Sequence, residues 1–209
     1  MSLLFVYRLV EHSKHDIKRV YVYKMEQNPP EEVRFMTNVL DLTDLVHELA
    51  NVCWDAGRKD INPHLVAIAE NFLESYDPNE LIDVFIRHSY MHWEKIHDRD
   101  EDFFISNAHV IFQHLPVDTN NINAFKVFFE AKNNRGEYII PKEDRDAIWN
   151  IFDSLVKICI KYVHKVRGVK LVKTDDGIRP AYQNKKYPEI KVRELAKLWE
   201  IDLPIPGKD

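Results

Sequence analysis

A long apolar stripe between Pro141 and Arg167 constrains the fold of this chain more than any other feature. Apolar residues recur there at spacings of three and four, which is the period of one helix face. At 1.5 Å per residue such a helix would be about 40 Å long, so we expect it to cross the domain as its central helix. Gly168 is expected to end it. The stripe consists of Ile148, Ile151, Phe152, Leu155, Cys159, Tyr162, Val163 and Val166.

Shorter helical patterns precede this stripe and predict a bundle of helices around it. Two pairs, Asn62-Pro63 and Asp77-Pro78, combine a capping side chain with a proline in the first turn, and each predicts the start of a helix. The expected helices run from about Asp41 to Ala56, Asn62 to Tyr76, Pro78 to His97, Asp98 to Leu115 and Thr119 to Lys132.

The two ends of the chain carry different patterns. Residues 1–28 are rich in β-branched and aromatic side chains and predict a small β-hairpin. Residues 168–209 predict an extended basic arm, with a small hairpin near Gly177 and a short helix from about Glu189 to Glu200. The expected fold is therefore mainly α, an irregular multi-helix bundle whose core is residues 29–167. A chain of 209 residues suits one domain, 1–209.

Charge is divided unevenly along the chain. The net charge is -5, but residues 157–197 hold twelve Lys and Arg against four Asp and Glu. Either this segment packs on the acidic remainder, or it binds an anionic partner such as a nucleic acid. The lysines and arginine expected to contact such a partner are Lys185, Lys186, Lys191, Arg193 and Lys197.

His88 and His92 are four residues apart, so an unbroken helix would place both on one face, where they could bind one metal ion. A third ligand would have to come from another element. The alternative is that both histidines are hydrogen-bonded packing residues beside the apolar stripe of their helix. We favour this alternative and expect no metal site.

Motifs for catalysis are missing from the sequence. It contains no Gly-rich phosphate loop, no Gly-x-Ser-x-Gly elbow and no Cys-x-x-Cys. Cys53 and Cys159 lie on or beside apolar stripes and are expected to be small buried side chains. We therefore expect no catalytic residues, no cofactor and no enzyme activity. The two distant cysteines, and a first segment without a signal-peptide pattern, predict a reducing compartment, and no apolar run is long enough to span a membrane.

The stretch from Phe85 through His88-Ser-Tyr-Met-His92-Trp to Ile111-Phe-Gln-His-Leu-Pro116 resembles helical proteins of nucleocytoplasmic large DNA viruses, namely their small virion and minor capsid proteins. The resemblance covers residues 85–116 and supplies no site residues. It implies a structural protein of the virion, or of the host cytoplasm, that contacts neighbouring coat proteins.

Three functions follow from these patterns. The first is a structural or protein-interaction protein, a minor capsid component. It fits the paired aromatics Phe103-Phe104 and Phe128-Phe129, since one member of each pair would face a partner unless the helices are sandwiched between others. The second is a nucleic-acid-binding protein that uses residues 157–197. The third is a metal-dependent enzyme or metal-stabilised fold built on His88 and His92.

Overall fold

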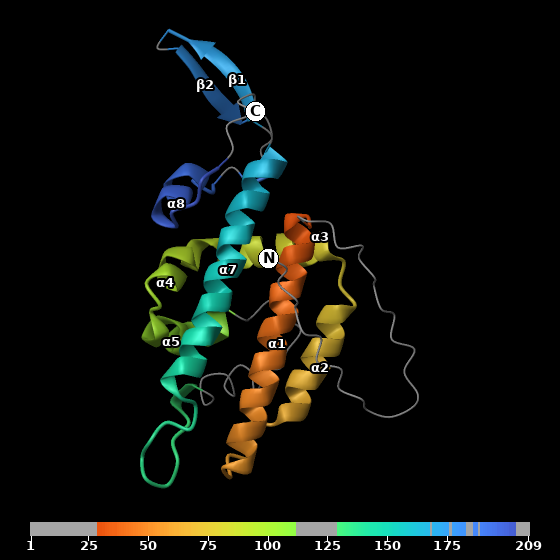
Figure 1. Cartoon of the computed structure of the whole chain (residues 1–209), viewed down its shortest axis with the longest axis vertical. Helices are drawn as coiled ribbons and strands as arrows, with labels where there is room; N and C mark the ends of the chain where they lie inside the picture. The colour runs from red at the N-terminus through yellow and green to blue at the C-terminus, as the bar shows by residue number, and fades with distance from the viewer. Residues whose placement is uncertain are drawn as a thin grey trace, which may run out of the picture.

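The computed structural model describes residues 29–111, 129–167, 169–175, 177–182, 186–187 and 189–203. It is mainly α-helical, with shorter helices packed around two long ones, α1 (Glu31–Asp55) and α7 (Lys142–Arg167). These two helices lie side by side (Figure 1). The predicted central helix is thus confirmed as α7.

Helix α1 begins at Glu31, well before the expected start at Asp41. Pro30 is its N-cap, and Glu31 and Glu32 occupy the first turn, where carboxylates interact favourably with the positive end of the helix dipole. Phe35 is fully buried in the added segment. The apolar stripe that begins with Leu45 gives no sign of this earlier start.

The cap-proline pairs correctly marked the next two helices. The Asp77 side chain accepts hydrogen bonds from the backbone N–H groups of Asn79 and Glu80. Asn62 accepts one from the N–H of His64. The remaining helices and strands are α2 (Pro63–Glu74), α3 (Pro78–Ser89), the 3-10 helix η1 (Tyr90–His92), α4 (Trp93–His97), α5 (Glu101–Ile111), β1 (Val169–Thr174), β2 (Gly177–Tyr182) and α8 (Val192–Leu198).

The expected single helix from Pro78 to His97 is broken, and this prediction was wrong. The Ser89 hydroxyl donates to the carbonyl of Phe85 and accepts a hydrogen bond from the indole Nε1 of Trp93. A serine that bonds back to the preceding turn often bends a helix. Here η1 replaces a regular turn, and Trp93 is fully buried beyond the break.

A second correction concerns the start of α5. Asp100, rather than Asp98, accepts the backbone N–H of Phe103 and is the capping residue. Arg99 immediately before it has a φ of 51°, a left-handed conformation that non-glycine residues rarely adopt. That reversal of the chain ends α4 and separates it from α5.

Strands β1 and β2 form an antiparallel hairpin that extends beyond the end of α7 (Figure 1). Their register runs from Val169 opposite Tyr182 to Thr174 opposite Gly177. Gly177 has a φ of 114°, which suits glycine at the turn. The expected small hairpin in this region is therefore present.

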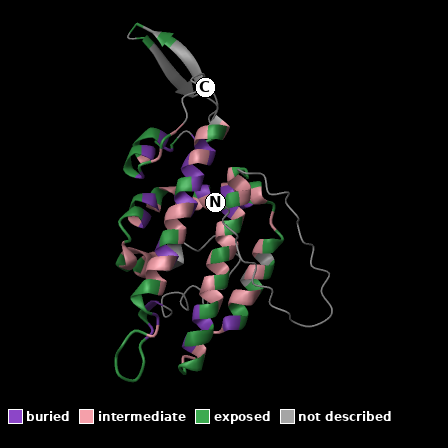
Figure 2. Ribbon diagram, viewed as in Figure 1, coloured by how far each residue is buried: buried purple, intermediate pink, exposed green. Residues whose placement is uncertain are grey.

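Two apolar clusters form the core of the described residues. The larger joins α1, α3, α4, α7 and α8, and the smaller joins the second half of α1 to residues 129–140 and the start of α7. Leu42 and Phe152 pack against both clusters. Buried positions consequently face inward along both long helices, and the exposed ones face outward (Figure 2).

The expected extended C-terminal arm is also corrected. Its described residues from 186 to 203 fold back onto α7 instead of extending from it. The side chains buried in the larger cluster are Tyr187, Ile190, Val192, Ala196 and Trp199. The predicted hairpin of residues 1–28 lies outside the described residues. Among those described, no helix is long and apolar enough to cross a membrane.

Candidate interaction surface

The histidine pair is divided between two elements. His88 is in α3, whereas His92 ends η1 beyond the break at Ser89. The ring of His92 packs against Phe103 with centroids 5.3 Å apart, and burial lowers the pKa of His92. Within the described residues, no three His, Cys, Asp or Glu side chains form a group that could hold a metal ion.

Both cysteines are buried, as the sequence predicted. Cys53 and Cys159 have no exposed surface and form no disulfide. Burial raises the pKa of the Cys53 thiol, and raises that of Cys159 well above its ordinary value. Thiols with raised pKa values stay protonated at neutral pH, so neither cysteine is an activated nucleophile.

The carboxylate of Asp83, which the sequence patterns did not single out, joins several elements of the described structure. It lies on α3 and accepts hydrogen bonds from the hydroxyls of Tyr162 on α7 (3.3 Å) and Tyr187. The ammonium of Lys186 lies 2.5 Å from its second oxygen. One carboxylate thus joins α3, α7 and the C-terminal segment.

The protonation states of this cluster are fixed at neutral pH. Burial opposes ionisation of Asp83, but hydrogen bonds from Lys186 and both tyrosines outweigh it and hold its pKa below the usual range. Burial, followed by the hydrogen bond to Asp83, raises the pKa of Tyr187. An ionised carboxylate with protonated hydroxyl donors makes a stable polar junction, and it is poorly suited to exchanging protons near pH 7.

The sequence gives only a faint signal of Asp83. The residue follows Ile82, which is fully buried, and precedes Val84, which is half-buried. An acid in such an apolar run needs a partner. The partners lie about eighty to one hundred residues further along the chain, and spacing along one helix cannot identify them.

Acidic residues of α1 and α3 partly neutralise the basic segment, residues 157–197. Lys186 pairs with Asp83, and Lys165 pairs with Glu31 at 3.1 Å. Of the predicted contact residues, Lys191 pairs with Glu194 of its own segment. The pairs with α1 and α3 fit the first interpretation of the uneven charge, in which residues 157–197 pack on the acidic remainder of the chain.

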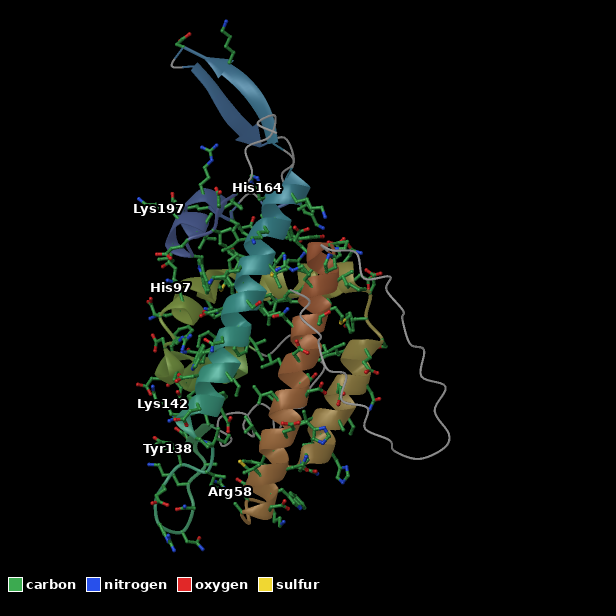
Figure 3. The ribbon with its side chains drawn as sticks, in the orientation of Figure 1. Arg58, His97, Tyr138, Lys142, His164 and Lys197 are labelled. Atoms are coloured by element: carbon green, nitrogen blue, oxygen red, sulfur yellow. The ribbon has the colours of Figure 1, made fainter. Side chains whose placement is uncertain are left out.

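The remaining predicted contact residues have different positions. Arg193 and Lys197 are exposed on α8, and Figure 3 labels Lys197. The Lys157 ammonium of α7 lies 6.0 Å from the ring centre of Trp199, so it belongs to the same side of the molecule. Lys185 lies outside the described residues.

One aromatic pair is sandwiched between elements. Phe103 and Phe104 are both half-buried, with edge-to-face rings 5.5 Å apart, and Phe104 packs in turn against Trp149 of α7. Phe129 is buried, and Phe128 lies outside the described residues. Neither Phe103 nor Phe104 is therefore an exposed contact for a partner.

Exposed apolar side chains gather instead on α2. This helix packs on α1, and its outward side carries Leu65 and Ile68, whose exposed fractions are 36% and 65%. Val66 and Leu73 on the other side pack into the two clusters. A helix with apolar residues on both sides is expected to be covered on both. In Figure 1, α2 lies at the outer edge of the bundle.

Acidic side chains lie where α2 meets α1. Burial and the neighbouring Asp44 raise the pKa of Asp41. Burial, Asp44 and Glu74 likewise raise the pKa of Glu70, and His47 lies 3.9 Å from Glu70. A carboxylate that raises the pKa of its neighbour repels the neighbour's charge, so a cation brought near Asp41 or Glu70 would be stabilised.

Comparisons of the chain with models of protein families, with curated proteins and with solved structures found no match.

Proposed function

We propose that this chain is a structural, protein-interaction protein, a minor capsid component of a large DNA virus that contacts neighbouring coat proteins in the virion or in the host cytoplasm. The observation that carries the proposal is the outward side of α2. Ile68 is 65% exposed there, beside the exposed Leu65, on an edge helix. Adjoining apolar side chains on a protein surface are typical of contact sites for other proteins.

The rest of the described structure is compatible with this role. The buried thiols, the fixed protonation of the Asp83 junction and the broken helix between His88 and His92 provide no group activated for catalysis. The resemblance of residues 85–116 supplies the capsid part of the proposal.

Site-specific photo-crosslinking in assembled virus particles tests this function. A photo-reactive amino acid would replace Ile68 in α2, and in a matched control it would replace Asp102, an exposed residue on α5. We expect position 68 to give one strong crosslinked product that contains a coat protein, identified by mass spectrometry. Position 102 should give little or none.

Two results would contradict the proposal. One is the absence of this chain from purified virus particles. The other is equal, diffuse crosslinking from positions 68 and 102, because a specific contact through α2 requires a difference between them.

A further inference from the structure

We propose that the hairpin of β1 and β2 binds duplex DNA by lying in its major groove. This activity goes beyond the proposed function and uses another part of the molecule, since the hairpin and α2 lie apart in Figure 1. A protein can therefore contact a coat protein through α2 while its hairpin contacts DNA.

Positive charge within residues 157–197 is concentrated around the hairpin. Residues 189–203, which include α8, carry three Lys and Arg against four Asp and Glu, so they add no net positive charge. Lys165 and Lys186 each pair with a carboxylate of α1 or α3. Residues 167–185, which run from the end of α7 through both strands, hold five Lys and Arg against two Asp and Glu.

The strands themselves contain cations and no acids. β1 contains Lys170 and Lys173, and β2 contains Arg179. The two acids, Asp175 and Asp176, fall between the strands in the sequence. Lys173 is exposed. DNA attracts such cations, because each phosphate that they neutralise releases counterions condensed on the duplex.

The register of the hairpin places two of these cations on one face. Lys170 is opposite Ala181, and Val172 is opposite Arg179. Alternate residues of a strand belong to the same face, so Lys170 and Arg179 share a face with Val172 and Ala181. Lysine and arginine on one face can contact the phosphates that border a single groove.

The shape of the hairpin suits the major groove of B-DNA, which is about 12 Å wide and admits a two-stranded β-ribbon. Each strand has six residues, so the ribbon is about 20 Å long at about 3.3 Å per residue. The hairpin extends beyond the end of α7 and makes few contacts with the described helices (Figure 1). Because an isolated two-stranded hairpin is only marginally stable in water, we expect a partner to stabilise it.

An anionic membrane surface fits this arrangement less well. Val169, Leu171 and Tyr182 belong to the face opposite that of Lys170 and Arg179. If this apolar face entered the lipid, the two cations would lie on the side away from the anionic headgroups. Duplex DNA is therefore the partner that the pattern favours.

Binding of the full-length chain to a fluorescent DNA duplex tests the inference. The duplex has an arbitrary sequence longer than one helical turn, and fluorescence anisotropy is measured over a range of salt concentrations. We expect the logarithm of the affinity to fall linearly with the logarithm of the salt concentration. The triple variant Lys170→Gln, Lys173→Gln, Arg179→Gln should bind at least about tenfold more weakly, with a salt slope smaller by about three.

A second triple variant, Lys191→Gln, Arg193→Gln, Lys197→Gln, is the matched control. It removes the same number of charges from exposed positions in and beside α8. Its affinity for the duplex should stay within about twofold of the wild type, because salt screens charges that do not contact DNA. A third variant, Lys170→Arg, Lys173→Arg, Arg179→Lys, keeps the charges of the hairpin and should bind like the wild type.

Three outcomes would overturn DNA binding by the hairpin. They are a wild-type chain that does not bind the duplex at low salt, equal weakening by the two glutamine variants, and tighter binding to vesicles that contain anionic lipid than to the duplex. Equal weakening would show an effect of net charge alone. The proposed function is tested separately, because crosslinking from position 68 does not involve the hairpin.

Discussion

At the scale of single residues, Asp83 connects three parts of the described structure. Its carboxylate joins α3 to Tyr162 of α7 and to Lys186 and Tyr187 of the C-terminal segment. Hydrogen bonds to a charged group are stronger than those between neutral groups, and losing the acceptor leaves partly buried donors unpaired. Asp83 is therefore a key residue for the position of the C-terminal segment.

The Asp83→Asn variant should be less stable at pH 7 by about 1–3 kcal/mol. Folding lowers the pKa of Asp83, so its stabilising effect is present above the ordinary aspartate value of about 3.9 and is lost as the pH falls through the lower folded value. The stability difference from the wild type should shrink by pH 3. Urea unfolding at both pH values measures it.

Glu80→Gln provides a matched control for that substitution. It makes the same chemical change on the same helix, but Glu80 is exposed, and its free energy of unfolding should stay within about 0.5 kcal/mol of the wild type. An Asp83→Asn variant as stable as the wild type at pH 7 would show that the carboxylate does not hold the segment.

At the scale of secondary-structure elements, helix boundaries are decided by which side chain satisfies the free N–H groups. Sequence reasoning found Asp77 and Asn62 because each precedes a proline. Three aspartates alternate before α5, and the sequence predicted Asp98 as its cap. In the structure the carboxylate of Asp100 accepts the hydrogen bond from the N–H of Phe103. The left-handed conformation of Arg99 decides between them, and that conformation is not evident from composition.

Alanine substitutions separate the two candidate caps of α5. Asp100→Ala should lower the thermal unfolding midpoint, because it removes the cap and the ion pair with Lys95. Asp98→Ala should change the midpoint much less, because the Asp98 carboxylate is exposed and contacts the exposed ring of the neighbouring His97. Thermal unfolding of both variants measures the difference, and equal losses would reject Asp100 as the cap.

At the scale of the whole molecule, the C-terminal segment completes the larger apolar cluster. Trp199 is 4% exposed and lies edge-on to His97 of α4, with ring centroids 5.2 Å apart. It packs with residues of α7 in the same cluster. The described residues of this segment, 186–187 and 189–203, thus pack as part of the core.

Removing the indole of Trp199 should therefore weaken the whole fold. Trp199→Ala is expected to cost about 3–5 kcal/mol, the usual loss for a large buried aromatic side chain. The neighbouring exposed substitution Leu198→Ala should cost less than about 1 kcal/mol. Denaturant unfolding followed by circular dichroism compares the two, and a small effect of Trp199→Ala would mean that the segment is held elsewhere.

The sequence by itself determined the helical class, the central helix α7, two helix starts and the burial of both cysteines. These follow from the period of the apolar residues and from local capping, which act within one or two turns of a helix. Tertiary structure decided the pairing of Lys186 with Asp83, the packing of Trp199 on the helix bundle and the exposure of Ile68. Each depends on residues far apart in the chain or on which side of a helix is covered, and such contacts are set by packing and not by local periodicity.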